Sequence, residues 1–93
     1  MAKLIIPTPL RKFTENQSAL ESNGSTVIEA MQDLANEYPN LKKHIFDDHG
    51  KIRNFIRIYL GNDDIQSLQN ENTPVADDSV ISIIPAIAGG TNN

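Results

Sequence analysis

The strongest constraint on the fold is one amphipathic helical segment, which ends at Pro39. Thr26 is a capping residue type, and Glu29 follows it at the spacing of a capping box. The residue before a proline disfavours helical torsions, so the helix should stop at Pro39. Such a helix must bury its single apolar stripe against a second layer. The stripe has the spacing i, i+3, i+4, i+7, i+11 and consists of Val27, Ala30, Met31, Leu34 and Tyr38.

Short strand-forming segments surround this helix and predict the second layer. The polar stretch 65–73 has room for only a short edge strand, and residues 41–46 for one more short helical turn. The sequence therefore predicts an α+β fold with a mixed four- or five-stranded sheet and one main helix on one face, arranged as in the ubiquitin-like β-grasp. The expected strands are residues 3–8, 18–22, 55–60 and 80–84.

Length and composition indicate one small intracellular domain. The chain has 93 residues, a net charge of −4 and no cysteine. The acidic balance argues against nucleic acid or an anionic membrane as the main partner, because both require positive charge. The apolar run 80–88 is interrupted and is far shorter than the ~20 residues of a membrane helix. We expect a cytoplasmic domain over residues 1–85 and a flexible tail over 86–93.

The residues that could support catalysis or metal binding have simpler explanations. The segment His44–His49 holds two imidazoles and two carboxylates, but we interpret it as a solvated helix end and loop rather than a metal site. The pairs Asp63-Asp64 and Asp77-Asp78 are interpreted as turn formers. We therefore predict no catalytic residue, no bound metal and no bound cofactor, and we expect that the protein is not an enzyme.

The second face of the predicted sheet is a candidate docking surface. Strand alternation places Phe55, Arg57 and Tyr59 opposite the helix, and Ser82 and Ile84 should lie on the same side. A single helix covers only one face, and an exposed apolar patch usually marks a protein partner. The alternative is that the central loops fold over this face.

The end of the sequence is its most distinctive feature. Gly89-Gly90 follows the last predicted strand after a short spacer. Two residues without side chains allow another protein to approach the backbone closely, as in a narrow channel. A frayed terminus is the alternative, since Gly-Gly alone is a weak motif.

These features together resemble the ubiquitin-like sulfur-carrier proteins of the MoaD/ThiS family, and most of all its CysO-like branch. The Pro-Ala-x-Ala-Gly-Gly ending is the most specific element. The resemblance spans essentially the whole chain and rests on Ile6-Pro7-Thr8, Leu10-Arg11, residues 55–60, Asp78-Ser79-Val80 and residues 84–90.

The resemblance implies a carrier on which other enzymes act. Gly90 would bear a thiocarboxylate, and Ile87, Ala88 and Gly89 would thread into partner sites. The implied partners are an adenylylating enzyme of the ubiquitin-activating type, which uses ATP and a sulfur source, and a pyridoxal-phosphate-dependent cysteine synthase. Cysteine biosynthesis is the expected pathway, with molybdopterin or thiamin synthesis as alternatives.

The chain departs from the family at one point, because Thr91-Asn92-Asn93 follows Gly90. We therefore expect cleavage between Gly90 and Thr91 by a metalloprotease before the protein acts. Two other functions stay open: a ubiquitin-like modifier joined to lysines through Gly90, and a β-grasp interaction module whose tail is inert.

Overall fold

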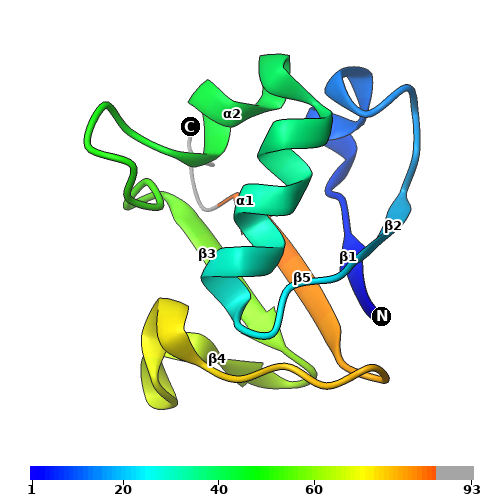
Figure 1. Cartoon of the computed structure of the whole chain (residues 1–93). Helices are drawn as coiled ribbons and strands as arrows, with labels where there is room; N and C mark the ends of the chain where they lie inside the picture. The colour runs from blue at the N-terminus through cyan, green and yellow to red at the C-terminus, as the bar shows by residue number, and fades with distance from the viewer. Residues whose placement is uncertain (86–93) are drawn as a thin grey trace.

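The computed structural model describes residues 1–85, in which the strands form one five-stranded mixed sheet (Figure 1). The strand order is β2-β1-β5-β3-β4. β1 and β5 run parallel at the centre, and the other neighbours are antiparallel. This sheet confirms the predicted α+β class. Its strands are β1 (Ala2–Ile5), β2 (Ala19–Ser22), β3 (Ile56–Leu60), β4 (Asp63–Asp64) and β5 (Val80–Pro85).

Two helices, α1 (Val27–Glu37) and α2 (Pro39–Ile45), pack on one face of the sheet (Figure 1). The predicted stripe of α1 is buried except at Tyr38, which is partly buried and ends the helix. Pro39 does end α1, but it also occupies the first turn of α2, where its missing N–H costs nothing. The short turn expected at 41–46 is therefore part of a seven-residue helix.

The core lies between the helices and the sheet. The strand residues that point toward α1 alternate with exposed ones, as predicted for β3 and β5. They include Leu4, Ile56, Ile58, Ile81 and Ile83, none of which is more than 6% exposed. Burial of these aliphatic side chains is the main source of stability for a domain of this size.

The N-terminal cap of α1 differs from the predicted capping box in one bond. The Thr26 hydroxyl accepts from the Glu29 N–H at 3.3 Å, as expected. The Glu29 carboxylate, however, accepts from the backbone N–H and the hydroxyl of Ser25, at 3.0 and 2.8 Å. Two donors at Ser25 outcompete the single Thr26 N–H, so the cap reaches one residue further back.

The predicted edge strand within 65–73 is wrong. The edge strand is β4, and the stretch instead forms two short 3₁₀ helices, η2 (Ile65–Ser67) and η3 (Asn70–Asn72). The Asp64 carboxylate accepts from the Gln66 N–H at 2.9 Å, which turns the chain out of the sheet directly after β4. β1 ends at Ile5 rather than at the predicted residue 8, where a third 3₁₀ helix, η1 (Thr8–Phe13), begins.

Candidate functional site

The pairing of β3 with β5 brings four of the predicted docking residues together on the face opposite the helices. Arg57 lies opposite Ile84, and Tyr59 lies opposite Ser82. Ser82 also pairs with Ile5 of β1, which extends the surface across the centre of the sheet. We call Ile5, Arg57, Tyr59, Ser82 and Ile84 the open face. The fifth predicted residue, Phe55, directly precedes β3 and is 37% exposed.

The loops within residues 1–85 leave this face accessible. Ile84 is 44% exposed, and Val80, which alternation places on the same side, is 39% exposed. Exposed aliphatic side chains on a sheet face are consistent with a protein contact surface. Val80 completes the apolar part of the face. It was recognisable from the sequence, because it alternates with Ser82.

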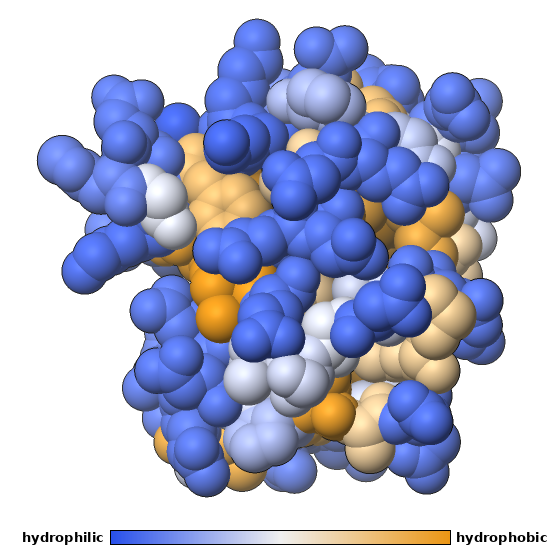
Figure 2. Space-filling view, in the orientation of Figure 1, coloured by the Kyte–Doolittle hydropathy of each residue, from blue (hydrophilic) through white to orange (hydrophobic). Residues whose placement is uncertain are grey.

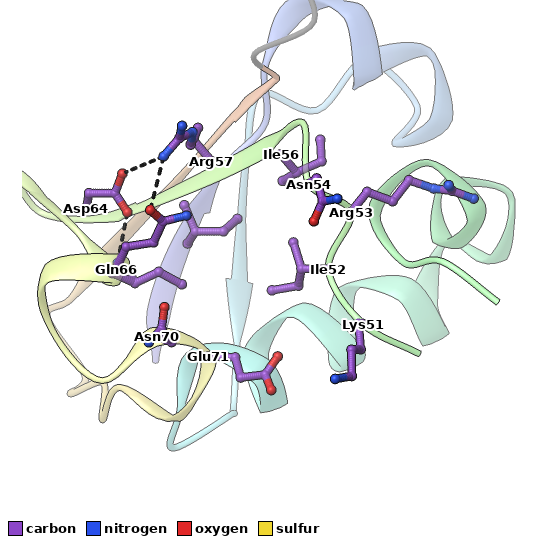
Figure 3. A pocket seen from close by; sticks show the side chains of 12 residues that line it. Lys51, Ile52, Arg53, Asn54, Ile56, Arg57, Asp64, Gln66, Asn70 and Glu71 are labelled. Carbon is purple, nitrogen blue, oxygen red and sulfur yellow. Dashed lines mark hydrogen bonds and ion pairs between the residues drawn. The ribbon is translucent and has the colours of Figure 1, made fainter. Parts of the chain in front are cut away.

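Arg57 lies at the edge of the open face, where two neighbouring side chains hold its guanidinium group. Its guanidinium donates to the Asp64 carboxylate at 3.5 Å and to the Gln66 side-chain oxygen at 3.2 Å (Figure 3). These residues line part of a notch of about 220 Å³ beside β3. The two partners of Arg57 were not predicted as site residues, because the hairpin between β3 and β4 was not recognised from the sequence.

The root of the tail is fixed by the last pair of the sheet. Pro85 lies opposite Ile56, so β5 ends beside the start of β3. The remaining predicted site residues, Ile87, Ala88, Gly89, Gly90 and Thr91, lie outside the described part of the chain.

The His44–His49 segment stabilises the local fold. His44 was expected to be solvated, but it is half-buried and its ring stacks on Phe13 with centroids 4.3 Å apart. Burial lowers the pKa of His44, and the nearby positive charges act in the same direction. The Asp47 carboxylate accepts from the N–H groups of Lys51 and His49, and these bonds lower its pKa. Within residues 1–85, no group of three His, Asp or Glu side chains is arranged to hold a metal ion.

The helix-bearing side of the molecule is mostly hydrophilic, with small apolar areas between charged side chains (Figure 2). None of the helices in residues 1–85 has the length and apolar character to span a bilayer.

Comparison with known proteins gives one consistent result. The model of the ThiS family matches residues 4–90. The chain is 32% identical, over 87 residues, to the sulfur carrier protein CysO of Mycobacterium tuberculosis, and the match covers 91% of this chain and 94% of that protein.

Solved structures show the same fold. CysO in the BexX/CysO complex of Amycolatopsis orientalis matches with a TM-score of 0.87 and 29% identity, covering 97% of this chain and all of that one (100%). The small archaeal modifier protein 1 of Methanosarcina acetivorans matches with a TM-score of 0.87 and 26% identity, over 96% of this chain and 95% of that one. The fold is therefore the β-grasp fold of these carriers and modifiers, as predicted.

Proposed function

The chain belongs to the ThiS family, and on that basis we propose that it is a sulfur carrier of the CysO type that receives sulfur at Gly90. The main support is the match over residues 4–90, which includes the Gly-Gly pair and ends at Gly90.

The chemistry needs a partner, because a free carboxylate is a poor acylating group. In the first step a carboxylate oxygen of Gly90 attacks the α-phosphorus of ATP, which gives an acyl-adenylate and releases pyrophosphate. Hydrosulfide, or a persulfide with a reductant, then attacks the carbonyl carbon, the carbon–oxygen bond to AMP breaks, and a thiocarboxylate remains. ATP and the sulfur source act at the activating enzyme, and we propose that this chain holds no cofactor of its own.

The open face is the proposed docking surface for that enzyme. β5 connects the two parts of the site, since Ile84 lies on the open face and the next residue, Pro85, is the tail root. A partner that binds Tyr59 and Ile84 is therefore positioned beside the origin of the tail. Arg57, held by Asp64, would supply a charge at the edge of this contact.

Activation requires a free carboxyl group on Gly90. Thr91-Asn92-Asn93 follows it in the sequence, so we propose that a metalloprotease first cleaves the bond between Gly90 and Thr91.

After Gly90 has received sulfur, the proposed acceptor enzyme is a pyridoxal-phosphate-dependent cysteine synthase. This assignment is supported by the similarity to CysO, and the alternatives are acceptors for molybdopterin or thiamin synthesis.

A second candidate function is conjugation to proteins. The likeness to small archaeal modifier protein 1 favours it, because that protein is named as a modifier. The same acyl-adenylate would then react with a lysine amine instead of sulfide, and lysine adducts with a Gly-Gly remnant would identify this outcome.

The test is to incubate the chain ending at Gly90 with the activating enzyme of its host, ATP and sulfide, and to measure the intact mass. The expected result is a gain equal to the exchange of one oxygen for one sulfur. The control is the chain ending at Asn93, which should not react. A form ending at Gly90 that stays unmodified under these conditions would contradict the proposal.

A further inference from the structure

A path of direct contacts leads from the tail root to a group of positive charges. Pro85 lies opposite Ile56, whose N–H donates to the Arg53 carbonyl at 3.0 Å. The Arg53 Nε in turn donates to the Lys43 carbonyl in the last turn of α2, at 2.8 Å. The side chain of Arg53 points away from the notch beside β3 (Figure 3). The base of the tail and the end of α2 thus belong to one end of the molecule.

Lys12 joins the same group through the stacked rings of Phe13 and His44. Its Nζ lies 5.2 Å from the centroid of the Phe13 ring, which stacks on His44 of α2. Burial is the main cause of the lowered pKa of His44, and the positive charges of Lys43, Lys12 and Arg53 lower it further. We call Lys12, Lys43 and Arg53 the tail-end cluster. Lys12 and Lys43 are exposed.

The opposite end of the sheet has the opposite charge. β5 begins there, preceded by Asp77-Asp78, and the hairpin of β3 and β4 ends there. From residue 58 to residue 85 the sequence contains no lysine or arginine, and its five acids are Asp63, Asp64, Glu71, Asp77 and Asp78. The segments around the tail end hold more bases than acids: the bases are Arg11, Lys12, Lys42, Lys43, Lys51 and Arg53, and the acids are Glu15, Glu37, Asp47 and Asp48.

From this arrangement we infer that the tail-end cluster is a second contact surface, which binds an acidic protein surface bordering the site that receives the tail. The inference rests on the proposed function, because it assumes that a partner takes up the tail. A protein is favoured over nucleic acid as the occupant. The net charge of −4 and the acidic far end repel an extended polyanion, whereas a local acidic patch meets only the positive end.

The physical consequence is orientation before contact. The molecule is positive at the end of the sheet where β5 stops and negative at the end where β5 begins. It therefore turns its tail end toward a negative surface as it approaches. Such steering raises the association rate and is screened by salt. It should therefore affect KM and its ionic-strength dependence, and leave kcat unchanged.

The experiment measures kcat and KM for AMP formation by the activating enzyme of the host, with the chain ending at Gly90. The test variant is K12Q/K43Q, which removes two exposed positive charges. The matched control is N62D/Q69E, which changes the net charge equally at exposed positions of the acidic end. We expect kcat/KM of K12Q/K43Q to fall about tenfold at low salt, and this difference to shrink strongly at ~0.5 M salt. The control should stay within about twofold of the parent.

The outcomes distinguish a failure of the proposed function from a failure of the tail-end cluster as a contact surface. If the unsubstituted chain is not activated, the proposed function fails, and the inference fails with it. If it is activated but K12Q/K43Q behaves like N62D/Q69E, only the inference is overturned. Binding of a fluorescent single-stranded RNA that is lost in K12Q/K43Q would also overturn it, by assigning the cluster to nucleic acid.

Discussion

Ile56 of β3 lies directly opposite Pro85 of β5. This end pair of the two strands is also the point from which the tail begins. The residue before Pro85, Ile84, is exposed on the open face, and the one before that, Ile83, is buried in the core. Three consecutive residues therefore connect the core, the docking surface and the tail.

The alternation at the end of β5 predicts losses of stability of very different size for neighbouring substitutions. Ile83→Ala removes a side chain that is 2% exposed, and should lower the free energy of unfolding by about 2–4 kcal/mol. Ile84→Ala, at 44% exposure, should cost less than about 1 kcal/mol. Urea denaturation of both variants checks this. Equal losses would show that the assignment of faces is wrong.

The open face predicts a separate effect on activation. Ile84→Ala and Tyr59→Ala should keep the fold but lower kcat/KM with the activating enzyme by about tenfold or more, because central interface residues dominate binding. Gln32→Ala, at an exposed position of α1 on the other side of the sheet, is the control, with less than a twofold change expected. Unaltered activation of both open-face variants would exclude this face as the docking surface.

The Glu29 cap predicts a pH-dependent contribution to stability. Hydrogen bonds from the Ser25 backbone and hydroxyl lower the pKa of Glu29 below its ordinary value of 4.5. A carboxyl with a lowered folded-state pKa stabilises the native state above its unfolded-state pKa, and this contribution is lost as the pH falls through the lowered value.

Glu29→Gln should therefore be less stable than the parent near neutral pH, and the two should converge in acid. Thermal unfolding of both proteins between pH 7 and pH 3 measures this, with Glu21→Gln on β2 as the control. A difference that stays constant over this range would contradict the proposed cap.

Gly24 should tolerate no side chain. A Cβ at this position would lie 2.4 Å from the Ala30 nitrogen and 2.7 Å from the Glu29 carbonyl carbon, both of them backbone atoms of α1. Gly24→Ala must push the helix away, at a cost of about 1–3 kcal/mol. Asn23→Ala, at the exposed neighbouring position, should change stability by less than ~0.5 kcal/mol in the same denaturation experiment.

The parts of the fold that follow from periodicity were predictable. The stripe of α1 and the alternation of β3 and β5 each repeat over several residues, so one ambiguous position does not change the interpretation. The edge strand was misplaced, because it consists of only two aspartates, Asp63 and Asp64, which are typical turn residues. Their pairing with Tyr59 and Leu60 depends on the tight hairpin, and no local repeat indicates it.

The positions of the proposed docking residues were predictable in part. Alternation placed Arg57, Tyr59, Ser82 and Ile84 on one face, whereas the pairing of Arg57 with Ile84 depends on the strand register, which the structure supplies. The bonds of Arg57 to Asp64 and Gln66, and the stacking of His44 on Phe13, join segments from different parts of the sequence. Such contacts depend on tertiary packing, which single-sequence patterns do not encode.

Sulfur carriage at Gly90 can be read directly from the intact mass of the protein isolated from its native host under conditions that protect thioacids. We predict a chain that ends at Gly90, part of which has one oxygen of the terminal carboxyl group replaced by sulfur. Recovery of active protein that still ends at Asn93, with no sulfur exchanged at any position, would contradict the proposed sulfur carriage.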